Sequence, residues 1–248
     1  PAPPVQNPVW GASAPFAGLI ADKYGAGRVL AGSAVLYALG LVLMANPVAP
    51  WSFVLSAGIL IGLGLSGVTF SVVQGVIGRR YPPEKRSMAL GISAAAGSFG
   101  QFALLPFTQW LLTGVGWHGA LLTLAAVGLL MVPLAIGMVE KRGHHAGHLF
   151  QQSAGEALRE ALAHRGYVLL TVGFFVCGFQ VLFVGVRLPA YLADRGFPAH
   201  VAVVALALVG LFNIVGTYTT GWLGGRMPKR WILSAIYFGR AVVIALFI

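Results

Sequence analysis

Eight apolar stretches, each about long enough to cross a bilayer, constrain the fold of this chain more than any other feature. A spanning helix needs roughly 20 apolar residues, and a backbone in lipid must satisfy its hydrogen bonds within helices or closed barrels. Long runs without alternation, such as Ser56–Gly67, argue against strands. We predict an all-α, polytopic membrane helical bundle. Its helices are expected at 5–21, 28–45, 51–78, 86–113, 117–139, 167–192, 199–222 and 231–248.

The distribution of charge supports this count. Only 9% of the 248 residues are charged, against roughly 25% in a soluble domain. The net charge of +10 could suggest nucleic-acid binding, but all Lys and Arg residues except Arg187, Arg195 and Arg240 lie in the odd-numbered loops. This is the positive-inside pattern. We therefore expect the lipid bilayer as the environment, no nucleic-acid partner, and basic loops on the cytoplasmic side of the plasma membrane.

A polar stretch divides the chain. It lies between the fifth and sixth predicted helices, so we expect an N-terminal half at 1–139, a cytoplasmic linker at 140–166 and a C-terminal half at 167–248. Within the linker, Ser153–Glu156 has the form of a capping box, and 157–165 is typical of a short amphipathic helix at the membrane interface.

The linker also holds three histidines that could suggest a metal site. His144, His145 and His148 have spacings that share a helix face, but Gly143 and Gly147 disfavour a stable helix there. We interpret the stretch as a basic linker and expect neither a metal nor a cofactor. Cys177 is the one cysteine, which excludes a disulfide framework within these residues.

A loop motif occurs twice, at Gly18–Arg28 and, in weaker form, at Gly221–Arg230. Each copy follows a hydrophobic helix, makes a tight basic turn and leads into a second hydrophobic helix. A half-molecule repeated in the same orientation is typical of transporters that rock two halves around a central site. The second copy lacks the acid of the first, because Gly225 stands where Asp22 would be, and Pro228 replaces a glycine.

The first copy resembles the cytoplasmic loop motif of the major facilitator superfamily: a glycine, three residues, an acid, a base, then glycine and basic residues. In that family the motif joins helices two and three, and its weaker copy joins helices eight and nine. The resemblance covers essentially the whole chain and implies about eight of twelve helices, without the first and the last three. It assigns to a gating cluster, without substrate contact, Gly18, Asp22, Lys23, Gly25, Arg28, Arg79, Arg80, Arg226, Lys229 and Arg230. Within this cluster we expect Asp22 and Arg28 to form a charge relay with Arg79 or Arg80.

A finer match resembles the monocarboxylate transporters and the oxalate/formate antiporters. It comprises Arg79-Arg80-Tyr81, Lys85–Gly91, Gly97-Ser98 and Gly116–Ala120. His118 stands where that family usually has an arginine. A second departure is the helix Val201–Trp222, which carries no charge where the family often has a substrate arginine.

Two basic residues and no acid lie inside the predicted helices, and intramembrane charges point to function. Arg187 shares a helix face with Gln180 and Tyr191, and its planar guanidinium suits a carboxylate. Pro189 predicts a kink beside it. Snorkelling of Arg187 to the outer interface, or structural pairing, is the alternative. The candidate substrate contacts are Arg187, Gln180, Tyr191, Gln101, Asn213, Gln74 and Arg240; interhelical hydrogen bonding is the alternative role for the amides.

The resemblance and Arg187 together predict a monomeric secondary transporter for a small, monocarboxylate-like organic anion, working by alternating access. Because the predicted helices contain no acid, coupling would use the substrate's own proton, a counter-anion or another helix. Efflux of drugs or of neutral or acidic metabolites is the alternative, which the apolar bulk of Phe174, Phe175, Phe179 and Phe183 permits. A membrane enzyme or a non-transporting sensor is more remote, since no nucleophile elbow, metalloprotease motif or phosphate loop occurs.

Overall fold

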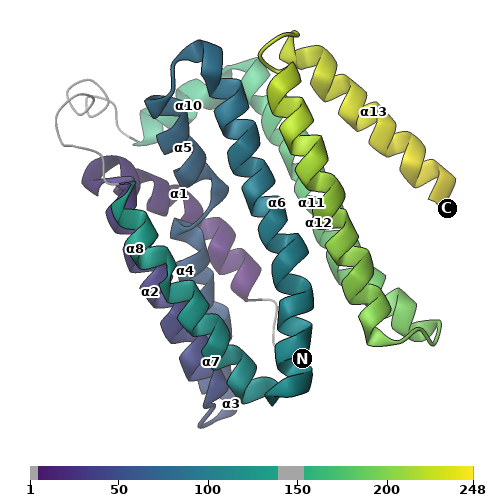
Figure 1. The fold of residues 1–248 in the computed structure, drawn as a ribbon. Helices are drawn as coiled ribbons and strands as arrows, with labels where there is room; N and C mark the ends of the chain where they lie inside the picture. The colour runs from purple at the N-terminus through teal and green to yellow at the C-terminus, as the bar shows by residue number, and fades with distance from the viewer. Residues whose placement is uncertain (1–4, 139–153, 248) are drawn as a thin grey trace. The chain divides into compact units, whose positions relative to one another are not determined.

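The computed structural model describes residues 5–138 and 154–247, and every regular element within these ranges is helical (Figure 1). The predicted all-α helical bundle is confirmed. Six of the described helical segments are long and apolar enough to cross a membrane: Ala26–Ala45, Pro50–Arg80, Pro83–Gly114, Gly116–Ile136, Arg165–Asp194 and Ala199–Leu223. The first and last predicted spans are also helical, as α1 (Gln6–Tyr24) and α13 (Lys229–Phe247), but do not belong to these six.

The chain forms two compact units, each described by itself. One comprises Pro1–Val139 with Ala207–Ile248, and the other comprises Glu140–Leu206. The first unit begins with α1 and α2 (Ala26–Ala45), which are joined by the single residue Gly25. Its φ of 96° is a conformation that side-chain-bearing residues rarely adopt, so glycine is required at this turn.

Two buried clusters hold the N-terminal helices together. α2 packs against α4 (Ile61–Gly67) and α7 (Gly116–Leu129) through one cluster, formed by Ala38, Leu41, Ala45, Ile61, Leu121 and Ala125. The other cluster gathers side chains from α1, α2, α5 (Phe70–Arg80) and α8 (Met131–Ile136): Ala21, Ala26, Leu30, Val72, Val76 and Ala135. Alanine supplies three of the six residues of each cluster, as expected where close packing helps helices to associate.

The helix predicted at 51–78 is not continuous, which corrects the prediction. It divides into α3 (Pro50–Phe53), a π-helix η1 (Val54–Leu60), α4 and α5. The break follows α4, where Thr69 has an extended backbone with ψ of 156°. Hydroxyl groups stabilise it: Ser66 Oγ donates to the Leu63 carbonyl at 2.7 Å, and Thr69 Oγ1 lies 3.1 Å from the Ser66 carbonyl. Such side-chain bonds to the preceding turn compete with the helical ladder.

A second predicted helix, at 117–139, is also interrupted. α7 ends at Leu129, and the short α8 follows after Leu130. Pro133 explains the interruption, because it has no N–H to donate to the carbonyl one turn earlier. In contrast, Pro106 lies inside α6 (Pro83–Gly114) and Pro189 inside α11 (Arg165–Asp194) without ending either helix.

The second unit contains α10 (Ala154–Ala163) and α11, followed by the first residues of α12 (Ala199–Leu223). The short linker helix expected at 157–165 is therefore present, although it begins earlier and ends before His164. Gly196, with a φ of 79°, makes the turn between α11 and α12.

Candidate functional site

The first loop motif contains an ion pair between two helix ends. Asp22, near the end of α1, lies 3.2 Å from Arg79, near the end of α5, measured from Oδ1 to Nη1. Of the two arginines predicted to meet the loop, the structure thus brings Arg79 to the carboxylate. Both side chains are substantially exposed, at 55% and 35%. Exposed pairs contribute about 0–1 kcal/mol, so this contact is weak enough to open and close.

The second loop motif has no acid and pairs its cations with aromatic rings. The Arg226 guanidinium carbon lies 3.8 Å from the centre of the Trp222 ring, and that of Arg230 lies 5.7 Å from the centre of the Trp231 ring. In the first copy, Lys23 Nζ lies 5.4 Å from the Tyr24 ring centre. The two copies share basic turns but differ in how their charges are paired.

α6 and α12 cross at a seam of small residues. A Cβ added to Gly91 would fall 2.6 Å from the Gly221 Cα, so the two backbones touch. Ser87 Oγ donates to the Gly221 carbonyl at 2.9 Å. Further along, a Cβ on Gly210 would fall 2.8 Å from the Phe102 backbone nitrogen. Since Ser87 meets Gly221 while Phe102 meets Gly210, the two helices run antiparallel.

Sequence reasoning did not find this seam. Ser87, Gly91 and Ala95 on α6 follow a spacing of four residues, as do Thr217 and Gly221 on α12. Small residues at that spacing were a usable signal of close helix packing. The sequence of α6 or of α12 alone did not show which helix packs against it.

A further contact that the sequence did not predict lies at the break between α4 and α5. Phe70 is the first residue of α5, and its ring covers Gly97 of α6 so closely that an added Cβ there would fall 2.6 Å from Cζ. The ring is nevertheless 52% exposed. The break between α4 and α5 therefore places an aromatic side chain on a glycine in the middle of α6.

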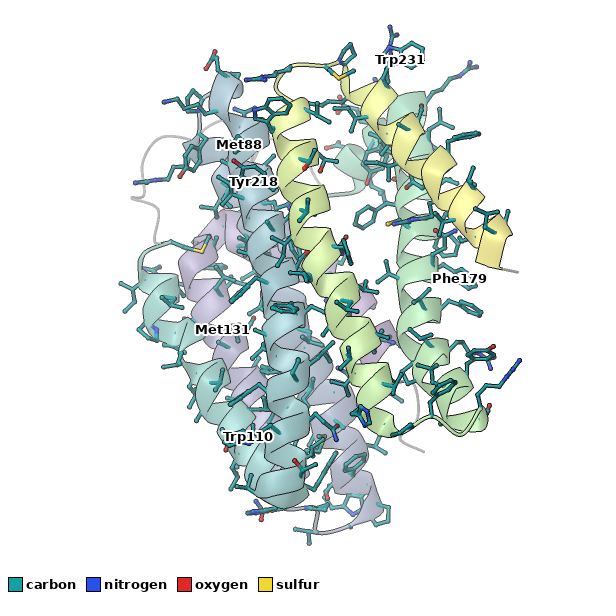
Figure 2. The ribbon with its side chains drawn as sticks, turned by 45° about the vertical axis from the view of Figure 1, so that its right-hand side comes forward. Met88, Trp110, Met131, Phe179, Tyr218 and Trp231 are labelled. Atoms are coloured by element: carbon teal, nitrogen blue, oxygen red, sulfur yellow. The ribbon has the colours of Figure 1, made fainter. Side chains whose placement is uncertain are left out.

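The principal substrate candidates lie on α11. Arg187 is exposed, Gln180 is half-buried, and Tyr191 is exposed with the Arg195 guanidinium carbon 5.2 Å from its ring centre. The neighbouring Phe179 and Phe183 stack, with ring centres 6.3 Å apart (Figure 2 labels Phe179). Arg187 thus lies next to an aromatic surface on the same helix.

The remaining substrate candidates are distributed over four other helices. Gln74 lies on α5, Gln101 on α6, Asn213 on α12 and Arg240 on α13. The backbone carbonyl of Asn213 accepts a hydrogen bond from Thr217 Oγ1 at 2.6 Å. That these side chains converge with Arg187 on one cavity stays a prediction.

His118 stands where the family usually has an arginine, and it connects the ends of two helices. Its Nε2 lies 3.1 Å from Asn46 Oδ1, while Asn46 Nδ2 donates to the Val42 carbonyl at 3.2 Å. Because the Asn46 oxygen must then accept, Nε2 of His118 carries the proton. The bond joins the end of α2 to the first turn of α7.

Two further features bear on ligand binding. An apolar pocket of about 290 Å³ lies between the end of α11 and the start of α12, lined by Pro189, Leu192, Ala193, Phe197, Pro198, Ala199, Ala202, Val203 and Leu206. It includes none of the predicted substrate contacts. In the described residues no group of three His, Cys, Asp or Glu side chains could hold a metal, and His144, His145 and His148 lie outside them.

Comparison with known proteins agrees with the architecture. The profile of the family described as Major Facilitator Superfamily matches residues 9–248. Monocarboxylate transporter 13 of Bos taurus is 28% identical over 214 residues, covering 86% of this chain and 49% of that protein. Monocarboxylate transporter 11 of Homo sapiens is 26% identical, covering 96% of this chain and 50% of that protein.

A bacterial relative is also similar. The putative niacin/nicotinamide transporter NiaP of Bacillus subtilis is 23% identical over 241 residues, which cover 92% of this chain and 60% of the relative. The chain spans about half the length of the monocarboxylate transporters that it matches.

Proposed function

The chain belongs to the Major Facilitator Superfamily, and on that premise we propose that the whole protein is a secondary active transporter that moves a small organic anion by alternating access between two helical halves. Membership of a transporter family, with relatives named as transporters, separates it from enzymes. Its long apolar helices make it an integral membrane protein. The plasma membrane, with the basic loops on the cytoplasmic side, is the proposed location.

The position of Arg187 within a membrane-spanning helix supports an anionic substrate. This arginine is a fixed positive charge within α11, about two helical turns before the acid at that helix's end, Asp194. A guanidinium presents parallel N–H groups that match the two oxygens of a carboxylate. The names of several relatives contain the word monocarboxylate, which agrees with this chemistry.

The positions of the acids limit how transport is coupled. In the described residues, Asp22, Glu84 and Asp194 lie near helix ends, and Glu156 and Glu160 lie on the linker helix α10. No described span thus carries a carboxyl group at its centre that could shuttle a proton. We propose that the proton travels on the substrate, that a counter-anion is exchanged, or that another helix of the whole protein carries the acid.

The experiment is uptake of labelled lactate, formate and oxalate into liposomes by the full-length protein. Arg187→Ala should lower uptake by at least about tenfold, since a hydrogen bond to a charged group contributes roughly 1.5–3 kcal/mol. Arg165→Ala is the matched control, because this exposed arginine begins the same helix and is not a substrate candidate. Unchanged uptake by Arg187→Ala would remove Arg187 from the mechanism.

Efflux of neutral or acidic metabolites or drugs is the second candidate. The stacked, exposed rings of Phe179 and Phe183 offer apolar surface beside Arg187. Organic cations are repelled by a guanidinium, so strong competition by cationic drugs would contradict carboxylate binding at Arg187 and favour efflux of drugs at a site that does not use this arginine.

A further inference from the structure

The two loop motifs carry similar positive charge, but only the first has a carboxylate to balance it. Asp22 pairs with Arg79 at 3.2 Å. In the second copy Gly225 takes the place of the acid, while three cations lie within five residues: Arg226, Lys229 and Arg230. No Asp or Glu occurs anywhere in 195–248.

The aromatic residues around these cations give the loop a membrane-interface character. Trp231 is 61% exposed, Met227 48% and Trp222 43%, and Figure 2 shows Trp231 at the start of α13, beside the loop from α12. Tryptophan favours the headgroup level of a bilayer. A guanidinium stacked on an indole, as Arg226 is on Trp222, keeps its edge N–H groups available for an anion.

We propose that this segment, Trp222–Trp231, is a binding site for the phosphate headgroups of anionic phospholipids. The lipid supplies the negative charge that Asp22 supplies in the first copy. Exposed indole rings beside the cations favour a lipid over a soluble acidic protein, because the rings gain from the interface while the cations bind phosphate. Each Lys or Arg near an anionic surface strengthens binding by about fivefold.

Gly225 allows the idea to be tested by restoring the missing acid. Its backbone lies outside the left-handed region, and an added Cβ would meet only the Trp222 carbonyl oxygen, at an ordinary 3.6 Å. Gly225→Asp therefore fits the loop. It places a negative charge where the phosphate would lie.

The experiment measures quenching of tryptophan fluorescence in full-length protein held in nanodiscs. Brominated phosphatidylglycerol is compared with equally brominated phosphatidylcholine, and Trp231→Phe identifies the loop's share of the signal. The variants are Gly225→Asp and the neutralised Arg226→Gln/Lys229→Gln/Arg230→Gln. Arg195→Gln is the matched control, since it also removes an arginine resting on an aromatic ring but lies beside Asp194.

We expect the unmodified protein to show stronger quenching of Trp231 by the anionic lipid. Gly225→Asp should lower this preference by about fivefold, and the neutralised variant should abolish it. Arg195→Gln should leave it unchanged, and raised salt should weaken it. Equal quenching by both lipids, or a preference that survives neutralisation, overturns the proposal. Because the readout is binding, it is independent of the transport assay.

Discussion

At the residue scale, Asp22 and Gly225 occupy equivalent places in the two loop motifs and differ by one negative charge. In the first motif that charge connects α1 to α5 through Arg79. In the second, the nearest aromatic rings take the cations instead. A substitution at Asp22 therefore breaks an ion pair, whereas a substitution at Gly225 does not.

Asp22→Asn should lower the initial rate of transport up to about fivefold, because an exposed ion pair contributes at most about 1 kcal/mol. Gly225→Asp should change that rate far less, because the arginines of the second copy already rest on the Trp222 and Trp231 rings and do without an acid. Uptake by full-length protein in neutral-lipid liposomes measures both. Asp194→Asn controls for loss of an acid at a helix end. Equal, negligible effects of Asp22→Asn and Gly225→Asp would rule out a gating role for the ion pair.

At the element scale, three of the four glycines of α6 have surroundings that differ sharply. Gly91 faces the backbone of Gly221, Gly97 faces the tip of the Phe70 ring, and Gly100 has nothing within 4 Å of an added Cβ. A backbone cannot move aside without separating the two helices, whereas a half-exposed ring can rotate. The three positions therefore allow one substitution to be compared in three environments.

Alanine at these positions should destabilise the full-length protein in the order Gly91, Gly97, Gly100. Gly91→Ala should cost about 1–3 kcal/mol, as overpacking does. Gly97→Ala should cost less than about 1 kcal/mol, and Gly100→Ala should gain about 0.5–1 kcal/mol from helix propensity. Thermal unfolding in detergent measures the series. If Gly91→Ala and Gly100→Ala melt alike, the backbone contact between α6 and α12 is not present in solution.

Comparison of the helices with their predicted ranges shows which elements the sequence could predict. Apolar runs located all eight long helical segments, because their length is set by the bilayer. The breaks at Thr69 and Leu130 were missed, because they depend on the hydroxyls of Ser66 and Thr69 and on the missing N–H of Pro133 rather than on hydrophobicity.

At the scale of the whole molecule, the alternation of charge predicts which loops face the cytoplasm. Val48, in the loop between α2 and α3, is 92% exposed, and Lys85 lies in the basic turn that begins α6. These positions lie at opposite ends of the span Pro50–Arg80, so they should lie on opposite sides of the membrane.

Single cysteines at these positions, in a cysteine-free full-length background, should respond differently to a membrane-impermeant maleimide. Val48→Cys should label on intact cells, and Lys85→Cys only after the membrane is opened. Mass-tag shifts on gels measure both reactions. The reverse pattern would invert the proposed topology.

Contacts between distant segments were the part that sequence reasoning could not supply. It proposed that Asp22 and Arg28 form a charge relay with Arg79 or Arg80, because the first loop motif supplies the acid and the next cytoplasmic loop supplies the arginines. It did not pair Gly91 with Gly221 or Phe70 with Gly97, since apolar periodicity shows that a helix has a packed face but not which helix packs there. For the same reason, it remains a prediction that the substrate candidates, such as Arg187 and Asn213, share one cavity.

The π-helix at Val54–Leu60 has a consequence for how the length of this span can vary. Ile61 N–H donates to the Ser56 carbonyl, five residues back, so the hydrogen bond encloses one residue more than in an α-helix. Deletion of one residue here would return the turn to α-helical geometry and leave the flanking turns in register. Elsewhere in the span, a deletion would rotate one end relative to the other by about 100°. Evolution can thus shorten this helix by one residue at η1 without turning its packed face toward lipid.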